Sequence, residues 1–191
     1  MRIISGSAKG RKLATFSGSA IRPTADRVRE ALFSILYSRL GSFQEKMVLD
    51  LYAGTGALGI EALSRGAARC VFVDQARTSV DLIRRNLEHV ALADRAEVRT
   101  DRVETLIPRL ASDTFDLVFI DPPYADKAIA SVIERVAAAG LLRHNGILCL
   151  ETGAKADLPE TVGLLHRFDQ RTYGTTLISF YEHADQGELQ S

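Results

Sequence analysis

From residue 47 onward, short apolar segments alternate with longer amphipathic ones. The apolar segments are rich in β-branched and aromatic residues, and they span 47–51, 70–74, 96–100, 115–120 and 146–151. The stretches between them place their apolar residues at helical spacing. Continuous apolar strands separated by amphipathic helices are typical of a parallel sheet covered on both faces. The pattern therefore predicts a doubly wound α/β domain with at least five parallel strands.

The two ends of the chain depart from this alternation. Residues 164–181 predict two strands joined at a turn near Gly174, without room for a crossover helix, so we expect an antiparallel hairpin on the sheet. At the front, RIIS and RKLAT flank GSAKG and predict a small hairpin with a basic tip. A helix follows over 22–40, with Thr24 as its N-cap. In total we expect a seven-stranded, mostly parallel sheet.

The chain is expected to divide into three parts. Residues 1–40 form the basic hairpin and helix packed on the core, 41–182 form the α/β domain, and 183–191 form a polar tail. The content of 46% hydrophobic and 25% charged residues is typical of a soluble globular protein. No segment reaches the ~18 apolar residues of a membrane helix, and the N-terminus lacks the apolar stretch of a signal peptide. We therefore expect a cytoplasmic monomer without membrane contact.

Charge is uneven along the chain although it sums to zero. Residues 1–30 hold seven basic side chains and two acidic ones, so the rest of the chain carries the compensating negative excess. A basic segment on an acidic body favours a docking site for a polyanion, although a solvated arm would have the same composition. The basic side chains are Arg2, Lys9, Arg11, Lys12, Arg22, Arg27 and Arg29.

A glycine-rich loop follows the first predicted strand. Gly54, Gly56 and Gly59 satisfy G-x-G-x-x-G between a strand and a helix, a spacing that serves NAD, FAD and other adenosine ligands alike. Asp50 lies four residues before Gly54, where its carboxylate disfavours a pyrophosphate and suits the ammonium and sulfonium of S-adenosylmethionine. A nicotinamide-dependent oxidoreductase remains the alternative from a different class.

Acidic residues end three successive predicted strands. Asp50, Asp74 and Asp101 therefore line the crevice at the carboxyl edge of the sheet, where such folds bind ligands. Asp74 is placed to accept both hydroxyls of an adenosine ribose, and Asp101 to receive the adenine amino group. Each acid alone is as readily a helix cap, but together they favour a cofactor site.

The fourth strand ends in the segment Asp121–Tyr124, with the sequence DPPY. Methylating a conjugated exocyclic amine requires that its two N–H bonds point at acceptors, so that the nitrogen lone pair faces the methyl group. The Asp121 carboxylate and the Pro122 carbonyl can be those acceptors. Pro123 stiffens the turn, and Tyr124 offers a face on which an extruded base can stack. We expect direct in-line transfer without a covalent intermediate.

Other nucleophiles and metal chemistry have little support in the sequence. Cys70 and Cys149 lie in apolar stretches without the spacing of a metal site or a disulfide framework, which favours buried thiols. The four histidines are dispersed, and we assign them no catalytic role and expect no metal. The amine could belong to guanine, adenine, cytosine or glutamine, so DNA adenine-N6 and protein glutamine-N5 methyltransferases remain alternatives. A non-catalytic RNA-binding assembly factor is a further one.

Five segments carry a family resemblance that covers nearly the whole chain: MRIISGSAKGRKL, RPTADRVREALFSIL, VLDLYAGTGALGIEALSRGA, DLVFIDPPY and RTYGTT. Together they resemble the bacterial 16S ribosomal RNA guanine-N2 methyltransferase D family, whose name specifies guanine 966. These are class I S-adenosylmethionine-dependent methyltransferases with a Rossmann-like fold. The resemblance implies methylation of small-subunit ribosomal RNA, within an assembling 30S particle whose ribosomal proteins would be neighbours.

The resemblance also implies roles for individual residues. The methionine end of the cofactor would contact Asp50, Tyr52, Gly54 and Gly56, the ribose Asp74, and the adenine Asp101 and Arg102. The target guanine would be held by Asp121, Pro122, Pro123 and Tyr124. Arg22 and Thr24 would close the crevice from the N-terminal side. The residues expected to bind RNA are Arg2, Lys9, Arg11, Lys12, Arg22, Thr24 and Arg27.

Overall fold

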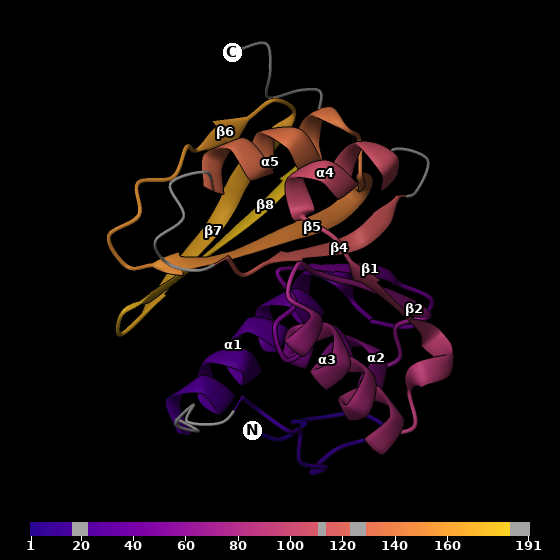
Figure 1. Cartoon of the computed structure of the whole chain (residues 1–191). Helices are drawn as coiled ribbons and strands as arrows, with labels where there is room; N and C mark the ends of the chain where they lie inside the picture. Colours follow the sequence, from indigo (N-terminus) through magenta and orange to yellow (C-terminus); the bar gives the residue numbers. More distant parts are fainter. Residues whose placement is uncertain (17–22, 111–113, 123–128, 184–191) are drawn as a thin grey trace.

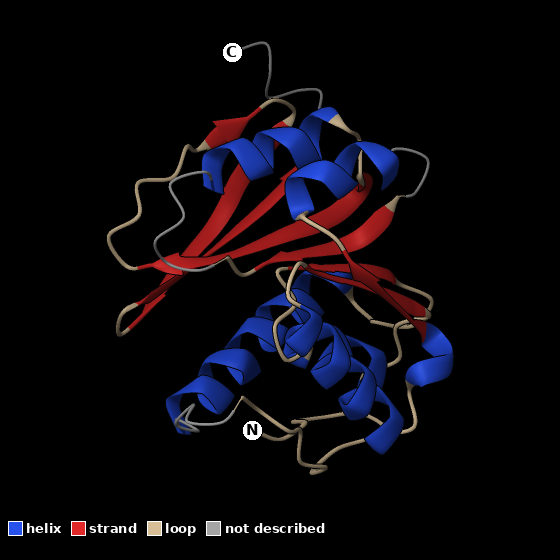
Figure 2. Ribbon diagram, viewed as in Figure 1, coloured by secondary structure: helices blue, strands red, loops and turns tan. Residues whose placement is uncertain are grey.

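The computed structural model describes residues 1–16, 23–110, 114–122 and 129–183, without the side chains of 23–25. Within these residues, eight strands form one sheet in the order β3-β2-β1-β4-β5-β8-β7-β6. Helices α1, α2 and α3 cover one face of the sheet, and α4 and α5 cover the other (Figures 1 and 2). This is the doubly wound architecture that the hydrophobic pattern predicts.

The strands confirm the parallel core and the antiparallel C-terminal hairpin. Strands β1 to β5 run parallel, and β8 and β7 extend the sheet in antiparallel pairing beyond β5. A two-residue strand, β6, pairs with β7 and adds an eighth strand to the seven expected. The bounds are β1 Met47–Leu51, β2 Arg69–Asp74, β3 Ala96–Thr100, β4 Phe115–Ile120, β5 Leu142–Gly153, β6 Thr161–Val162, β7 Leu165–Tyr173 and β8 Thr176–His183.

The helices lie where the helical spacing predicts them. They are α1 Pro23–Leu40, α2 Ala57–Ser64, α3 Arg77–His89, α4 Val103–Leu106 and α5 Ile129–Ala138, with short 3-10 turns at Ala93–Arg95 and Ile107–Leu110. Because α1 begins at Pro23, Thr24 lies in the first turn, and its predicted role as N-cap is wrong. None of the helices in the described part of the chain is long and apolar enough to cross a membrane.

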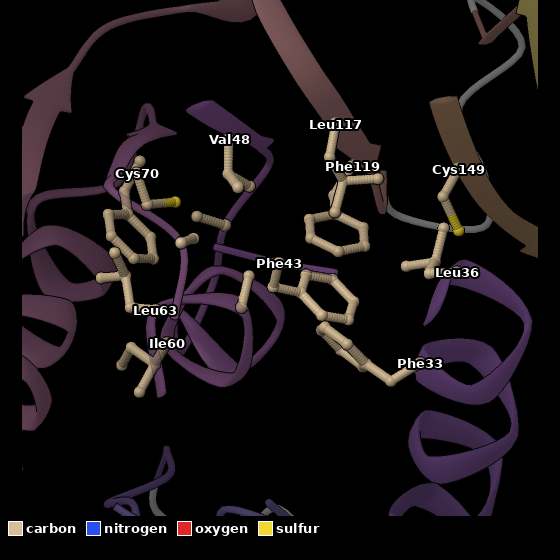
Figure 3. Close-up of a cluster of buried hydrophobic side chains, with 14 of the residues drawn as sticks. Phe33, Leu36, Phe43, Val48, Ile60, Leu63, Cys70, Leu117, Phe119 and Cys149 are labelled. Atoms are coloured by element: carbon tan, nitrogen blue, oxygen red, sulfur yellow. The ribbon is translucent and has the colours of Figure 1, made fainter. Parts of the chain in front are cut away.

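Strand alternation divides the core into two layers. Val48 of β1 and Phe119 of β4 point to the layer under α1, α2 and α3, where Phe33 and Phe43 pack against each other (Figure 3). Leu49 of β1 points to the layer under α4 and α5. Acidic residues two positions after Val48 or Phe119 therefore face the α1 side of the sheet, at its carboxyl edge.

The N-terminal segment forms the small hairpin predicted for it. An antiparallel bridge joins Arg2 and Lys12, and three backbone hydrogen bonds of 2.9 to 3.1 Å link residues 1–3 to residues 10–13 around it. The side chain of Glu61 in α2, which is fully buried, accepts the backbone N–H groups of Ile4 and Ser5 at 2.8 and 3.0 Å. These two bonds seat the hairpin on α2.

The third glycine of the loop allows α2 to pack closely on β2. A Cβ atom added to Gly59 would lie 2.3 Å from Phe72 Cε1 and 2.6 Å from Cys70 Sγ, and both side chains are fully buried. We expect Gly59→Ala to lower the free energy of unfolding by about 1–3 kcal/mol through overpacking. Urea denaturation measures this loss. Gly153→Ala is the matched control, because a Cβ there meets nothing within 4 Å; equal stability of the two variants would contradict the packing argument.

Candidate active site

A continuous crevice runs along the carboxyl ends of β1, β4 and β5. It consists of two cavities, of about 650 Å³ and 570 Å³. Both cavities are lined by Tyr52, Gly54, Asp121 and Glu151. The crevice lies where the strand order reverses between β1 and β4, which is the usual ligand site of an open α/β sheet. We name the larger part the first cavity and the smaller part the second cavity.

The glycine-rich loop bends sharply at the floor of both cavities. Tyr52, Gly54 and Gly56 have φ angles of 59°, 55° and 77°, in the left-handed region. Such an angle is unusual for a tyrosine, and unusual backbone conformations gather at functional sites. The Gly54 N–H donates to Asp74 Oδ2 at 2.9 Å, which ties the loop to the end of β2. The backbone is thereby held close to any ligand in the crevice.

Asp50 is a buried carboxyl group in the wall of the first cavity. It is 1% exposed, and its Oδ2 accepts the N–H of Gly59 at 2.9 Å. Burial raises the pKa of Asp50 to about 7, the Gly59 bond opposes that rise, and the charge of Asp74 adds to it. A cationic ligand group beside Asp50 would favour its ionised form.

The second cavity contains the residues predicted for the nucleoside end of the cofactor, with one exception. Asp74 and Arg102 line it beside Gln75 and Val103. Asp74 also accepts the Ala76 N–H at 2.8 Å, which fixes its carboxylate. Asp101 is not among the lining residues. Its carboxylate accepts the Arg102 N–H and pairs with Arg109 Nη1 at 3.1 Å.

Gly56 likewise serves the loop rather than the cavity wall. It precedes α2, and a Cβ atom there would lie 3.2 Å from the side chains of Ile60 and Ile83. The absence of a side chain at Gly56 therefore lets α2 and α3 approach the loop. Among the residues predicted for the methionine end, Asp50, Tyr52 and Gly54 line the first cavity.

Asp121 follows β4 at the junction of the two cavities. Its side chain is exposed to the crevice but set among protein atoms. This desolvation raises the pKa of Asp121 well above its ordinary value, and the charges of Glu151 and Asp50 raise it further. Pro122 lines the second cavity beside it. Pro123 and Tyr124 lie outside the described residues, so their predicted roles stay predictions.

The outer wall of the first cavity comes from both ends of the chain. The turn between β7 and β8 contributes Tyr173 to Thr176, and α1 contributes Val28, Arg29 and Leu32. Met1 and Phe16 complete the wall. The hairpin and the N-terminal helix, which depart from the parallel α/β pattern, therefore enclose the part of the crevice opposite the glycine loop.

A third hollow, of about 540 Å³, lies between the N-terminal segment and α1, and we name it the basic recess. Its charged lining residues are Arg2, Lys9, Asp26, Arg27 and Glu30. Met1 and Arg29 of the first cavity adjoin the recess directly in sequence. Three of the residues predicted to bind RNA thus gather in one recess, formed by the N-terminal segment and the helix that also contribute to the first cavity.

The other predicted RNA-binding residues are dispersed or outside the described part. Arg11 donates to the His89 carbonyl at 3.1 Å, and Lys12 is exposed on the same segment. Arg22 and the side chain of Thr24 lie outside the described residues. Their roles stay predictions.

Three residues of the site were missed by the sequence predictions. Glu151 ends the apolar segment 146–151, so the rule that selected Asp50 and Asp121 would have found it. Arg29 is 5% exposed, and its guanidinium donates to the Arg2 carbonyl and to Asp26. It is a buried cation in the cavity wall and suits a ligand carboxylate. No local signal identifies Asn86.

Asn86 of α3 connects the N-terminal segment to the glycine loop. Its Oδ1 accepts the Ala14 N–H at 2.8 Å, and its Nδ2 donates to the carbonyls of Ala14 and Thr55 at 3.1 and 3.0 Å. The side chain is 1% exposed, so these bonds are shielded from water. The loop and the basic segment therefore share one rigid support.

Comparison with known proteins gives a family match over most of the chain. The model of the family described as "Conserved hypothetical protein 95" matches residues 1–182. "Putative rRNA methyltransferase YlbH" of Bacillus subtilis is 37% identical over 184 residues, covering 95% of this chain and 98% of that relative. "Ribosomal RNA small subunit methyltransferase D" of Haemophilus influenzae is 32% identical over 187 residues, covering 96% and 94%.

A solved structure shares the fold of this chain over nearly its whole length. The "hypothetical protein TTHA0928" of Thermus thermophilus superposes with a TM-score of 0.81 at 29% identity. The match covers 95% of this chain and 99% of that one. Its sheet and covering helices thus correspond to nearly the whole fold described above.

Proposed function

Because the chain belongs to the conserved hypothetical protein 95 family, that of the ribosomal RNA small subunit methyltransferases D, we propose that it methylates the exocyclic N2 of a guanine in 16S ribosomal RNA. Methyltransferase activity itself follows from the family. The methyl donor in this proposal is S-adenosylmethionine, and the target is guanine 966. The observation that carries the proposal is the position of Asp121 and Pro122 in the crevice: Asp121 lies where the second cavity, which suits the nucleoside end of the cofactor, meets the first, which has room for its methionine end and for the target base.

The crevice fits S-adenosylmethionine better than a dinucleotide. Asp50 offers a carboxylate to the ammonium and sulfonium, and Arg29 offers a cation to the carboxylate of the methionine end. Asp74, in the second cavity, suits the ribose hydroxyls, and Val103 offers an apolar contact to the adenine. A pyrophosphate beside Asp50 would be repelled. The bound cofactor supplies an activated methyl group.

The residues of the chain hold the acceptor amine for that methyl group. The Asp121 carboxylate and the Pro122 carbonyl accept its two N–H bonds, so that the nitrogen lone pair points toward the cofactor side of the crevice. After transfer the nitrogen carries a positive charge and loses a proton. The raised pKa of Asp121 makes its carboxylate a suitable acceptor for that proton.

RNA would be held beside the crevice by its phosphates. The N-terminal segment and α1 contribute to both the basic recess and the first cavity, and we propose that the RNA backbone next to an extruded base contacts Arg2, Lys9 and Arg27 in the recess. Small-subunit RNA in an assembling particle, with ribosomal proteins as neighbours, is the partner we propose, in the cytoplasm and with the enzyme as a monomer.

Methyl mapping tests the function directly. Purified protein is incubated with labelled S-adenosylmethionine and with either naked 16S RNA or 30S particles from cells lacking the gene, and the modified nucleotide is located by mass spectrometry. We expect N2-methylguanine at one position. Transfer to adenine or to protein instead, or binding of NAD without binding of S-adenosylhomocysteine in calorimetry, would refute the proposal.

Cofactor binding is expected to tighten as pH rises through neutrality. Because the pKa of Asp50 is raised to about 7, the carboxyl is largely protonated at pH 6 and largely ionised at pH 8. The ligand ammonium favours the ionised form, so binding releases the proton, and affinity for S-adenosylhomocysteine should rise about tenfold from pH 6 to 8. Titration calorimetry in buffers of different ionisation enthalpy counts that proton. Asp50→Asn should abolish both the slope and the proton release; an unchanged slope would contradict the assignment.

A further inference from the structure

The sheet register places a second carboxyl group beside Asp121. Strands β4 and β5 are parallel with Ile120 opposite Leu150, so Asp121 and Glu151, one residue further on, point to the same face. Asp50 pairs with Phe119, two residues before Asp121, and faces the same side. Glu151 therefore lines the crevice beside Asp121, on the neighbouring strand further from β1.

The environment of Glu151 favours contact with a bound group. It is half-buried, it lines both cavities, and its charge acts on Asp121 and on Cys149. Among the described residues, no group of His, Cys, Asp or Glu is arranged to hold a metal ion. Two neighbouring carboxyl groups are suited to a ligand with two neighbouring hydrogen-bond donors.

Guanine is the base that presents two such donors. Its Watson–Crick edge carries N1–H directly beside the N2 amino group, whereas adenine and cytosine carry a ring acceptor beside their amines. With N2 held by Asp121, the adjacent ring position faces the neighbouring strand. A carboxylate there attracts N1–H of guanine and repels the lone pair of the other two bases, so one residue supplies both attraction and rejection.

We propose that Glu151 is the residue that selects guanine, by accepting N1–H while Asp121 and Pro122 hold N2. This role rests on the proposed function. It explains why β5 carries an acid where it borders the crevice, although the methyl transfer requires only one carboxylate. It also assigns base identity to a residue outside the DPPY segment.

A substituted RNA separates selection from chemistry. A target RNA with 2-aminopurine at the modified position keeps the acceptor amine but has a lone pair in place of N1–H. We expect the wild type to prefer guanine about 10- to 100-fold in kcat/KM, the effect of one hydrogen bond to a charged group. In Glu151→Gln the amide can donate to the 2-aminopurine ring nitrogen, so the preference should fall to within about threefold. Glu160→Gln, at an exposed glutamate, is the control and should keep the wild-type preference.

The possible outcomes test the role of Glu151 separately from the proposed function. If the wild type methylates guanine and Glu151→Gln retains the full preference over 2-aminopurine, the role of Glu151 is refuted and the proposed function stands. If the wild type methylates no guanine N2, the proposed function itself fails. If Glu151→Gln does not bind S-adenosylhomocysteine, the Glu151→Asp variant is tested in its place. Its side chain keeps the charge but is one methylene shorter, so the carboxylate lies further from N1–H. This variant should lose activity on guanine without gaining activity on 2-aminopurine. Wild-type preference in that variant also refutes the role.

Discussion

Replacement of Asp121 by alanine is expected to lower the methyl transfer rate about 1000-fold while leaving the affinity for S-adenosylhomocysteine within about threefold of the wild type. Asp121 accepts an N–H of the target amine in the proposed mechanism, and without it the nitrogen lone pair is not directed at the methyl group. The side chain is exposed to the crevice and is not part of the packed core, so its loss should leave the fold intact. Single-turnover transfer to 16S RNA and calorimetry with S-adenosylhomocysteine measure the two quantities separately.

Two further variants sharpen this experiment. Asp121→Asn keeps an acceptor oxygen but not the charge, and we expect an intermediate loss of about 10- to 100-fold. Asp157→Ala removes an exposed acid that lines neither cavity and should be as active as the wild type. If Asp121→Ala transferred the methyl group at nearly the wild-type rate, Asp121 would have no role in the mechanism. If its affinity for S-adenosylhomocysteine fell as much as its transfer rate, Asp121 would be a cofactor ligand instead.

Removing charge from the basic recess should weaken RNA binding by about 30-fold at 0.1 M salt. The double variant Lys9→Ala/Arg27→Ala takes away two exposed cations of the recess. Each phosphate contact contributes roughly 0.7 to 0.9 to the log–log dependence of affinity on salt, so the slope should become shallower by about 1.4 to 1.8. Filter binding of 16S RNA fragments over a salt series measures both values.

The matched control removes two cations elsewhere. Arg135 belongs to α5, which lies on the other side of the sheet (Figure 1), and Lys155 follows β5; both are exposed, and neither lines the recess. The variant Arg135→Ala/Lys155→Ala has the same change in net charge and should keep the slope and most of the affinity. If both double variants lose affinity equally, binding follows net charge and the recess is not a specific contact.

The acids that line the crevice could largely be predicted from the sequence because a parallel sheet brings its strand ends together. Acids at the carboxyl ends of its apolar segments are therefore brought to the same edge of the sheet, which is why Asp50, Asp74 and Asp121 line the crevice as expected. Glu151 obeys the same rule. Asp101 shows its limit, since its carboxylate pairs with Arg109, a residue whose proximity depends on the short turn after α4.

The N-terminal part was harder to predict because its contacts are distant in sequence. The sequence predicted the small hairpin but not what holds it on the core, since the N–H groups of Ile4 and Ser5 donate to Glu61, more than 50 residues away. Asn86 likewise holds Ala14 across 72 residues. A local pattern carries no record of such partners. The basic recess nevertheless belongs to the segment in which charge alone had indicated a docking site.

The seating of the N-terminal segment on Glu61 has a consequence for the order of events during synthesis. The basic segment leaves the ribosome first, yet the carboxylate that fixes its backbone belongs to α2, and Asn86 follows in α3. Domains begin to fold from the N-terminus as the chain emerges, but this segment has to wait for residues translated later. The nascent chain thus acquires an ordered cationic surface only once the glycine-rich loop and its helix have formed. Under the proposed function, the contacts of that surface with RNA could therefore form only after the part of the chain proposed to hold the methyl donor has folded.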